Sequence, residues 1–294
     1  MATKTVDAVG ALATRAMLVD LDIHFWNGHK RDQAISDEVA AKHNTDGSYN
    51  KRLIPKAELK ELWSCLGECA STHKHYTLPW SDSGDRIISA EAFFTYQQAM
   101  RKVIDKYNAA ADAFAAKYKS LVAHAKATEN HSFDPAHYPT DTEIRARYGV
   151  DIKYRPVPVG ADLRINMSDD ALSAVRASIN EDQQARIQVA IQNIADRVND
   201  VVGKMAVRLR EYKPSTDDSK AEHSFRDSLV DNVKELADLL PALNITGDPK
   251  IEAMAAALKE LAKVKPYVLR SDERVREKTA KAAEKILTKV SDFI

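Results

Sequence analysis

The fold is decided by one long stretch, residues 93–125, which reads FFTYQQAMRKVIDKYNAAADAFAAKYKSLVAHA. Apolar and aromatic side chains recur in it every three or four residues, which is the spacing of one face of an α-helix. The pattern predicts a helix over residues 90–128, with a coiled-coil-like seam and with Ser89 as its N-cap. The seam consists of Phe93, Tyr96, Met100, Val103, Tyr107, Ala110, Phe114, Tyr118, Leu121 and Ala125.

A second stretch with the same spacing follows Ser168, another good N-cap, and ends at Tyr212, just before Pro214. Two long helices that each carry one apolar stripe most simply pack on each other at a shallow angle. We therefore predict that the two form a long antiparallel helical pair. The second stripe consists of Leu172, Val175, Ile179, Ile187, Ile194, Val198, Val201, Met205, Leu209 and Tyr212.

The segment between these helices, residues 149–167, changes to period two. Apolar residues alternate with polar ones on both sides of a Pro-Val-Gly turn, which predicts a β-hairpin. Residues 19–25 alternate in the same way and predict a third strand with one apolar face. We therefore expect a small antiparallel sheet of three strands.

Shorter helices are predicted at 36–43, 56–73 and 141–147, and three more at 221–240, 249–264 and 272–292. The predicted fold class is mainly α (α+β): the long helical pair, the small sheet and a C-terminal helical bundle. The polar stretch 213–220, KPSTDDSK, is the predicted boundary. It divides the chain into a helical body with the sheet, 1–213, and a C-terminal helical region, 214–294.

The composition limits the classes of function. Lys plus Arg equal Asp plus Glu at 43 each, so no whole-molecule charge draws the protein to nucleic acid or to an anionic membrane. No stretch of about 18 apolar residues predicts a membrane span. Only two cysteines occur, and the N-terminus lacks the apolar run of a signal peptide, so we expect a cytoplasmic protein with no membrane partner.

Cys65, Cys69 and His73 are spaced at i, i+4 and i+8, which places them on one side of a helix. Thiolate and imidazole are ligands that zinc prefers. Positions eight apart on a helix are about 12 Å distant, however, too far to share one ion. The spacing therefore favours two half-buried thiols and a surface histidine, and we predict no metal and no cofactor.

Asp20, Asp22 and His24 alternate along the predicted first strand. Such a set could hold a divalent metal or place an acid beside a base, and it is the candidate catalytic site if the protein is an enzyme. Cross-strand ion pairs with Lys153, Arg155 or Arg164 explain the same residues without chemistry.

Trp26 is followed by His29, Lys30 and Arg31, and aromatic rings beside basic groups are typical of sites that stack bases and neutralise phosphates. A solvated turn after a strand explains them equally well. Helix geometry could add further basic groups on one side of the molecule for nucleic acid or a partner. These are Arg101, Lys102, Lys204, Arg208, Arg210 and Lys213.

The stretch HYTLPWSDSGDRIIS, residues 75–89, separates two helical patterns. We interpret it as a structural clasp, in which Trp80 plugs the junction between helix 56–73 and helix 90–128. Residues Ser81 to Gly84 then turn the chain, and Asp85 and Arg86 pair with each other or with backbone groups.

The sequence contains no Gly-rich phosphate loop, His-Glu-x-x-His, nucleophile elbow or Cys-x-x-Cys. Their absence favours a non-enzymatic function without excluding an enzyme.

A set of short motifs is spread over nearly the whole chain, at residues 16–32, 78–80, 84–86, 138–139, 156–166, 239–241 and 243–244. In these segments the chain resembles a family of uncharacterised proteins from bacteriophages and integrated mobile elements. The resemblance is diffuse and carries no catalytic signature. It implies a bacterial host cell, with genes for a MoxR-like ATPase and a von Willebrand A-type protein sometimes nearby.

The leading hypothesis is a helical interaction or adaptor protein in a larger assembly, with an AAA-type ATPase or a host protein as partner. The long helices also allow a homo-oligomer. The alternatives are a DNA-binding accessory protein for recombination or replication, an inhibitor of a host defence system, and a metal-dependent enzyme.

Overall fold

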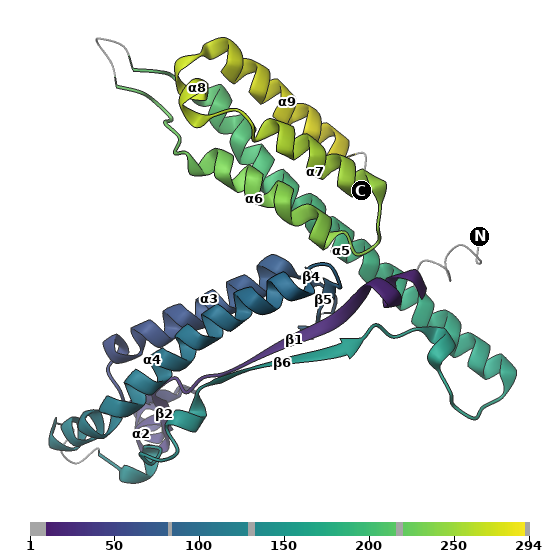
Figure 1. Cartoon of the computed structure of the whole chain (residues 1–294). Helices are drawn as coiled ribbons and strands as arrows, with labels where there is room; N and C mark the ends of the chain where they lie inside the picture. Colours follow the sequence, from purple (N-terminus) through teal and green to yellow (C-terminus); the bar gives the residue numbers. More distant parts are fainter. Residues whose placement is uncertain (1–9, 82–83, 129–132, 216–219, 292–294) are drawn as a thin grey trace. The chain divides into compact units, whose positions relative to one another are not determined.

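The computed structural model describes residues 10–81, 84–128, 133–215 and 220–291. It confirms the predicted fold class, because helices make up most of it and a small antiparallel sheet accompanies them (Figure 1). The chain divides into two compact units. Unit 1 comprises the described parts of Met1–Asp20, Tyr76–Phe94 and Tyr154–Ile294, and unit 2 comprises those of Leu21–His75 and Thr95–Lys153.

Unit 1 is built around the helix α5, Asp169–Glu211, which begins after Ser168 as predicted. The apolar stripe of α5 packs on α9, Glu273–Ser291, and on α6, Ser228–Leu243, while α6 packs on α7, Pro249–Leu261. The short helix α8, Pro266–Ser271, precedes α9. Buried side chains from these helices form one continuous core, with Val198, Val202 and Met205 of α5 among them.

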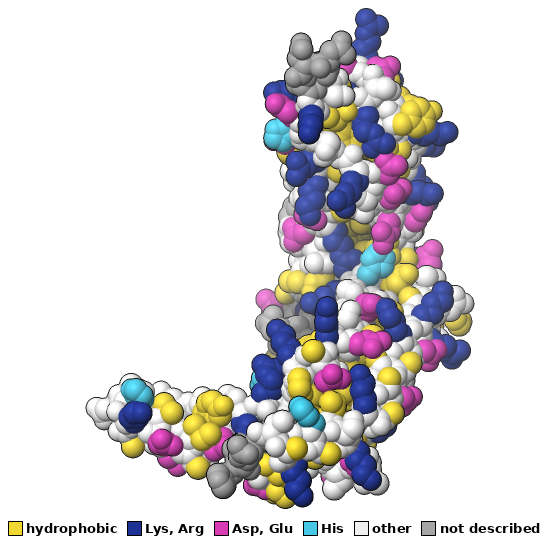
Figure 2. Space-filling view, turned by 90° about the vertical axis from the view of Figure 1, so that its left-hand side faces the viewer, with side chains coloured by type: hydrophobic (Ala, Val, Ile, Leu, Met, Phe, Trp, Pro, Cys, Tyr) yellow, Lys and Arg dark blue, Asp and Glu magenta, His cyan; other side chains and the backbone are white. Residues whose placement is uncertain are grey.

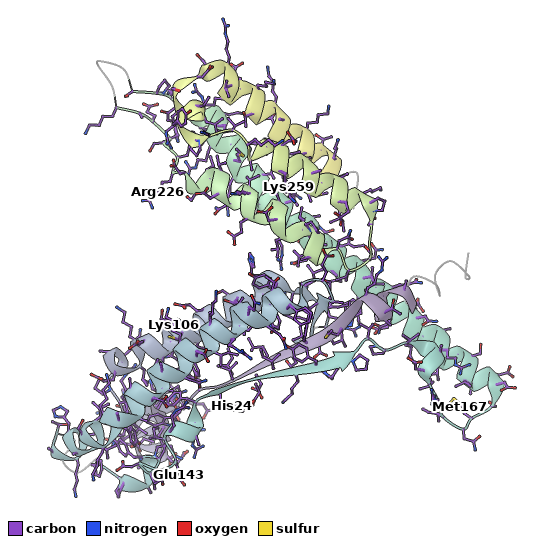
Figure 3. The ribbon with its side chains drawn as sticks, viewed as in Figure 1. His24, Lys106, Glu143, Met167, Arg226 and Lys259 are labelled. Atoms are coloured by element: carbon purple, nitrogen blue, oxygen red, sulfur yellow. The ribbon has the colours of Figure 1, made fainter. Side chains whose placement is uncertain are left out.

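Unit 2 contains most of α4, Phe93–Thr128, and it runs beside α3, Lys60–Tyr76 (Figure 1). Lys106 of α4, labelled in Figure 3, binds Glu68 of α3 at 2.6 Å. The predicted pairing of the two long helices is therefore corrected. An apolar stripe shows that a helix is buried on one side but does not select its partner, and the partners here are α3 for α4 and the C-terminal helices for α5.

The main sheet has the order β4-β5-β1-β6. The predicted first strand is present as β1, Ala16–His24, and it pairs antiparallel with β5, Arg86–Ser89, which in turn pairs with β4, Leu78–Pro79. Ser89 therefore ends a strand and does not cap α4 directly. Its Oγ instead accepts from the backbone N–H of Ala92, at 3.0 Å.

Only the first half of the predicted hairpin is a strand. It forms β6, Gly149–Pro156, whose neighbour is β1, and residues 163–167 are not a strand. Pro156 and Pro158 cannot donate to a ladder, and the short 3-10 helix η5, Gly160–Asp162, follows. Gly160 lies close to α5, because an added Cβ would be only 2.9 Å from the Arg176 carbonyl oxygen. The turn therefore packs tightly on this helix.

A second, two-stranded ribbon in unit 2 was not predicted. It pairs β2, His29–Asp32, with β3, Tyr49–Arg52. The two strands are joined by α2, Gln33–His43, whose N-cap Asp32 accepts from the backbone N–H of Ile35 at 3.1 Å.

The remaining expected elements differ mainly at their ends. The 56–73 helix begins with a 3-10 turn, η1, Lys56–Leu59, and 141–147 is a turn with the short η4, Arg145–Arg147, instead of a helix. The predicted boundary at 213/214 does not coincide with the division into units, because α6 and α9 pack on α5 and α7 packs on α6. Within KPSTDDSK, residues 216–219 lie outside the described residues. No helix of the described chain is both long and apolar enough to cross a membrane.

Candidate functional site

A cavity of about 770 Å³ opens in unit 2 where the β2–β3 ribbon meets the start of η1 and α3. Three of its lining side chains are cationic, one is a histidine and one is a tryptophan. None of the described residues that line it carries a carboxylate. We call it the ribbon pocket, and it is lined by Asn27, His29, Arg52, Lys56, Ala57, Leu59, Lys60 and Trp63.

The three cations of the ribbon pocket are exposed and uncompensated. Within the part of the chain that the structure describes, none of Arg52, Lys56 and Lys60 takes part in an ion pair. Other lysines of the same unit are neutralised, as Lys106 is by Glu68 and Lys117 by Glu58, at 2.6 and 3.1 Å. The pocket is therefore a local positive site on a chain of zero net charge.

The charge elsewhere is mixed. On the face drawn in Figure 2, Lys and Arg side chains alternate with Asp and Glu side chains, with no broad area of one sign. This agrees with the balanced composition, and it means that attraction for a polyanion depends on local sites such as the ribbon pocket.

Trp63 supplies the aromatic surface of the pocket. Its ring meets the ring of Phe25 with centroids 4.3 Å apart, and Phe25 in turn meets the edge of Tyr148 at 5.6 Å. Trp63 nevertheless remains 47% exposed. The indole is thus supported by Phe25 and remains half exposed.

The turn before the ribbon sets the position of the pocket. Gly28 has φ +67°, a conformation that favours glycine, and its carbonyl accepts from the backbone N–H of Leu53 at 2.8 Å. A Cβ at Gly28 would lie 3.1 Å from Leu59 Cδ1, so the chain passes close to the pocket wall. Asn27 Oδ1 accepts from the backbone N–H of His29 at 3.0 Å, which fixes the start of β2.

The register of the ribbon extends the basic surface beyond the pocket. His29 lies directly opposite Arg52, and Arg31 lies opposite Asn50. Directly opposite residues share a face, and residues two apart on a strand share it as well. Arg31 and Asn50 therefore continue the face on which His29 and Arg52 line the pocket. We call the pocket together with Arg31 and Asn50 the ribbon site.

The pocket lies at the start of a helical segment. The helical segment that starts at Lys56 has Pro55 as its N-cap, with no side-chain cap hydrogen bond. The first N–H groups of a helix have no intrahelical acceptor and carry partial positive charge, so a helix start suits an anion. Lys56 and Ala57, the first two residues of this segment, both line the pocket.

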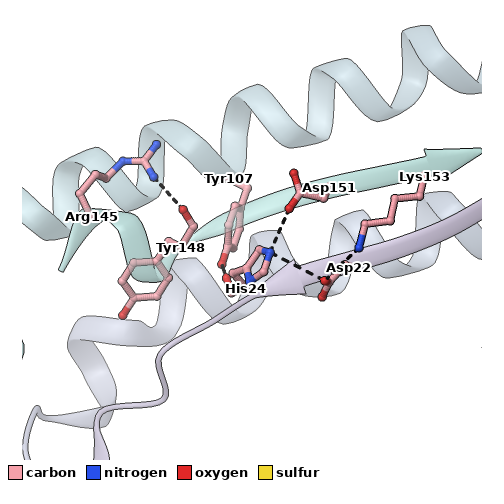
Figure 4. Close-up of polar contacts among 7 residues, drawn as sticks. All are labelled: Asp22, His24, Tyr107, Arg145, Tyr148, Asp151 and Lys153. Carbon is pink, nitrogen blue, oxygen red and sulfur yellow. Dashed lines mark hydrogen bonds and ion pairs between the residues drawn. The ribbon is translucent and has the colours of Figure 1, made fainter. Parts of the chain in front are cut away.

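Buried tyrosines anchor the chain that leads into the ribbon. Tyr107 Oη donates to the His24 carbonyl at 2.7 Å, and Tyr148 Oη donates to the Trp26 carbonyl at 3.0 Å (Figure 4 draws both tyrosines). Burial raises the pKa of both hydroxyls, so each stays protonated and able to donate. The Trp26 ring meets the edge of the Tyr118 ring at 5.9 Å. Trp26 is therefore part of this anchor, and Trp63 is the more open ring.

The candidate catalytic residues lie elsewhere in cross-strand contacts. His24 Nε2 is 3.0 Å from Asp151 Oδ2 and 3.8 Å from Asp22 Oδ2, and Lys153 Nζ is 3.9 Å from the same Asp22 oxygen (Figure 4). Asp20 is half-buried on the same strand. Among the described residues, no group of three or more His, Cys, Asp and Glu side chains is placed to hold a metal ion.

The basic residues predicted on the second long helix are mostly paired. Arg210 binds Glu284 of α9, Lys213 Nζ lies 2.7 Å from Glu222, and Lys204 Nζ lies 2.7 Å from Asp200. Arg208 is exposed. All four belong to unit 1, whereas Arg101 and Lys102 are exposed residues of unit 2.

Trp80 is 3% exposed and belongs to the buried core of unit 1, which also contains Ile187 and Ala190 of α5. Its carbonyl accepts from Arg186 at 2.7 Å. The backbone N–H groups of Trp80 and Ser81 both donate to the Asp85 carbonyl, at 3.0 and 3.1 Å. These hydrogen bonds close the turn that follows Trp80. Asp82 and Ser83 lie outside the described residues.

The side chains of Asp85 and Arg86 do not pair with each other. Asp85 forms an ion pair with Arg155, and Arg86 donates to the Thr77 Oγ1 and carbonyl at 2.6 and 2.9 Å. Burial lowers the pKa of Arg86.

Cys65, Cys69 and His73 share the buried face of α3, and both cysteines are free. The expectation of a surface histidine is wrong: His73 is 5% exposed, and its Nδ1 is 2.9 Å from Tyr96 Oη. Burial is the largest cause that raises the pKa of Cys69 to about 11, so this thiol is protonated at neutral pH.

Sequence reasoning found His29 and Arg31 but missed the rest of the site. Lys56, Lys60 and Trp63 are spaced at i, i+4 and i+7, which is one face of the predicted 56–73 helix, and that spacing could have linked them. Arg52 could not be found in this way, because only the ribbon register brings it beside His29.

No protein-family model, curated protein or solved structure matches this chain. The resemblance to a family of phage and mobile-element proteins therefore stays a prediction, and the argument for function rests on the ribbon site.

Proposed function

We propose that this protein binds nucleic acid through the ribbon site. The observation that carries the proposal is the group of cations, Arg52, Lys56 and Lys60, which share one pocket with no carboxylate in its lining. Uncompensated Lys and Arg side chains neutralise phosphates and release counterions, which supplies most of the sequence-independent affinity for nucleic acid.

The shape of the site supports a polymer over a small anion. Arg31 and Asn50 extend the basic face along the ribbon, away from His29 and Arg52, so the surface can follow more than one phosphate. This proposal corresponds to the DNA-binding alternative of the sequence analysis. The adaptor function stays a prediction, and one chain can combine it with a nucleic-acid site in unit 2.

Fluorescence anisotropy of the full chain with a labelled oligonucleotide, measured over a range of salt concentrations, tests the proposal. If the four cations Arg31, Arg52, Lys56 and Lys60 contact phosphates, log K should fall with log salt with a slope of about −3 for a single strand. The double variant Lys56→Gln/Lys60→Gln should reduce that slope by about 1.4, because two phosphate contacts are lost.

The matched control is the double variant Lys106→Gln/Lys204→Gln, which removes two lysines already paired with Glu68 and Asp200. Its affinity and salt slope should equal those of the wild-type chain. Absence of binding at low salt, or equal losses in the two double variants, would contradict the assignment of the site.

A further inference from the structure

We infer that the ribbon pocket takes one unpaired base of the bound strand, stacked on Trp63, and that the protein therefore prefers single-stranded over double-stranded nucleic acid. This inference rests on the proposed function. It adds the chemistry of the ligand, because phosphate contacts alone do not distinguish a single strand from a duplex.

The aromatic surface is arranged for a stacked ring. Phe25 covers part of Trp63, with 46° between the ring planes, and the indole remains half exposed beside the lining of the pocket. An open face on an otherwise supported ring is what a base needs, since every base offers a π-face of its own. Isolated exposed tryptophans without such support lose more side-chain freedom when they bind.

The rest of the wall suits the edges of a base. Leu59, which is 1% exposed, and Ala57 supply the apolar part. Asn27 uses its Oδ1 to accept from His29, which leaves its side-chain NH₂ as a donor at the pocket. The volume of about 770 Å³ lies within the range typical of small-molecule sites, so the pocket is large enough for a base.

The cations are placed to hold the flanking phosphates. Lys60 is three residues before Trp63 and Lys56 is four residues before Lys60, so all three share one side of the helical segment. Arg52 reaches the same pocket from the ribbon. When a strand stacks a base on Trp63, its flanking phosphates therefore lie near cations from both the helical segment and the ribbon.

A duplex cannot satisfy this site without distortion. Its bases are stacked and paired inside the helix, and extruding one costs a few kcal/mol, whereas a single strand has no such cost. Trp63 should therefore contribute to single-strand binding and contribute nothing to duplex binding, while Lys56 and Lys60 contribute to both.

The test compares the wild-type full chain with Trp63→Ala and Trp63→Phe, using a labelled oligothymidylate of about 20 nucleotides and a mixed-sequence duplex of the same length. Base–aromatic stacking contributes about 1–3 kcal/mol per base, so Trp63→Ala should weaken single-strand binding by roughly 5- to 150-fold. Duplex binding should not change. Trp63→Phe should keep most of the single-strand affinity, because it keeps an aromatic face.

Tryptophan fluorescence gives a second readout that does not depend on the alanine variant folding. The chain has three tryptophans, and stacking of a base should quench the emission of Trp63 alone. Oligothymidylate should therefore quench the wild-type emission and leave the Trp63→Phe emission unchanged. Quenching that persists in Trp63→Phe, or equal loss of single-strand and duplex binding in Trp63→Ala, would overturn the inference.

The two proposals fail in different ways. A wild-type chain that binds single strands and duplexes equally, with the expected salt slope, would keep the proposed function and refute the base pocket. A chain that binds neither would refute both.

Discussion

Two regions of the molecule combine a tryptophan with arginine or lysine, and they use them in opposite ways. In unit 1, Trp80 is 3% exposed and its neighbours Arg86 and Arg186 donate to backbone carbonyls. In unit 2, Trp63 is 47% exposed and lies beside cations with no ion-pair partner among the described residues. The same residue types thus form a structural clasp in one place and an open site in the other.

The difference follows from what each cation contacts. Arg86 and Arg197 both donate to the Thr77 carbonyl, at 2.9 and 2.8 Å, and burial, with a smaller effect of Arg86, lowers the pKa of Arg197 to about 10. Their hydrogen-bonding capacity serves the fold. Lys56 and Lys60 are exposed at the start of a helix, where water can be replaced by phosphate. The contacts of a basic side chain, and not its residue type, therefore separate the arginines that are hydrogen-bonded within the fold from the lysines that are exposed to solvent.

The largest loss of stability is expected for Trp80→Ala. Because Trp80 fills part of the unit 1 core, its removal leaves a cavity and should lower the free energy of unfolding by about 3–5 kcal/mol. Urea denaturation followed by circular dichroism measures the change. A wild-type midpoint for this variant would show that the clasp does not support the fold.

A smaller loss is expected for Arg86→Gln. The substitution removes two hydrogen bonds to Thr77 from a half-buried site, which should cost about 1–3 kcal/mol. The matched control is Arg155→Gln, whose side chain is 51% exposed in its ion pair with Asp85 and should cost less than about 1 kcal/mol. Equal midpoints for the two variants in the same urea titration would argue against a structural role for Arg86.

The sequence predicted the main elements of both regions but not how they pack. Period and caps predicted α5 after Ser168 and the strands β1 and β6, because those signals are local. The packing partner of each long helix was predicted wrongly, since several helices of unit 1 offer an apolar stripe and periodicity does not select among them. Trp80 was expected to be buried and is 3% exposed, and its carbonyl accepts from Arg186 of α5.

The ribbon site escaped prediction for a related reason. Strands β2 and β3 read HKRD and YNKR, with no apolar alternation, so nothing local distinguishes them from a solvated loop. Their backbone ladder and the intervening α2 hold them together. The residues of such a site come together only through the pairing of the two strands, so the structure is needed to find them.

A smaller loss of stability than for Trp80→Ala is expected for Trp63→Ala. The side chain is half exposed, so the free energy of unfolding loses only part of the burial of the indole together with the ring contact to Phe25, about 1–3 kcal/mol in all. The same urea titration measures it beside Trp80→Ala. A ring kept open for a ligand predicts this small cost together with a large loss of single-strand binding. If Trp63→Ala lowers the free energy of unfolding as much as Trp80→Ala does, Trp63 is instead a core residue of unit 2. A ring that stabilises the fold so strongly is not available to stack on a base.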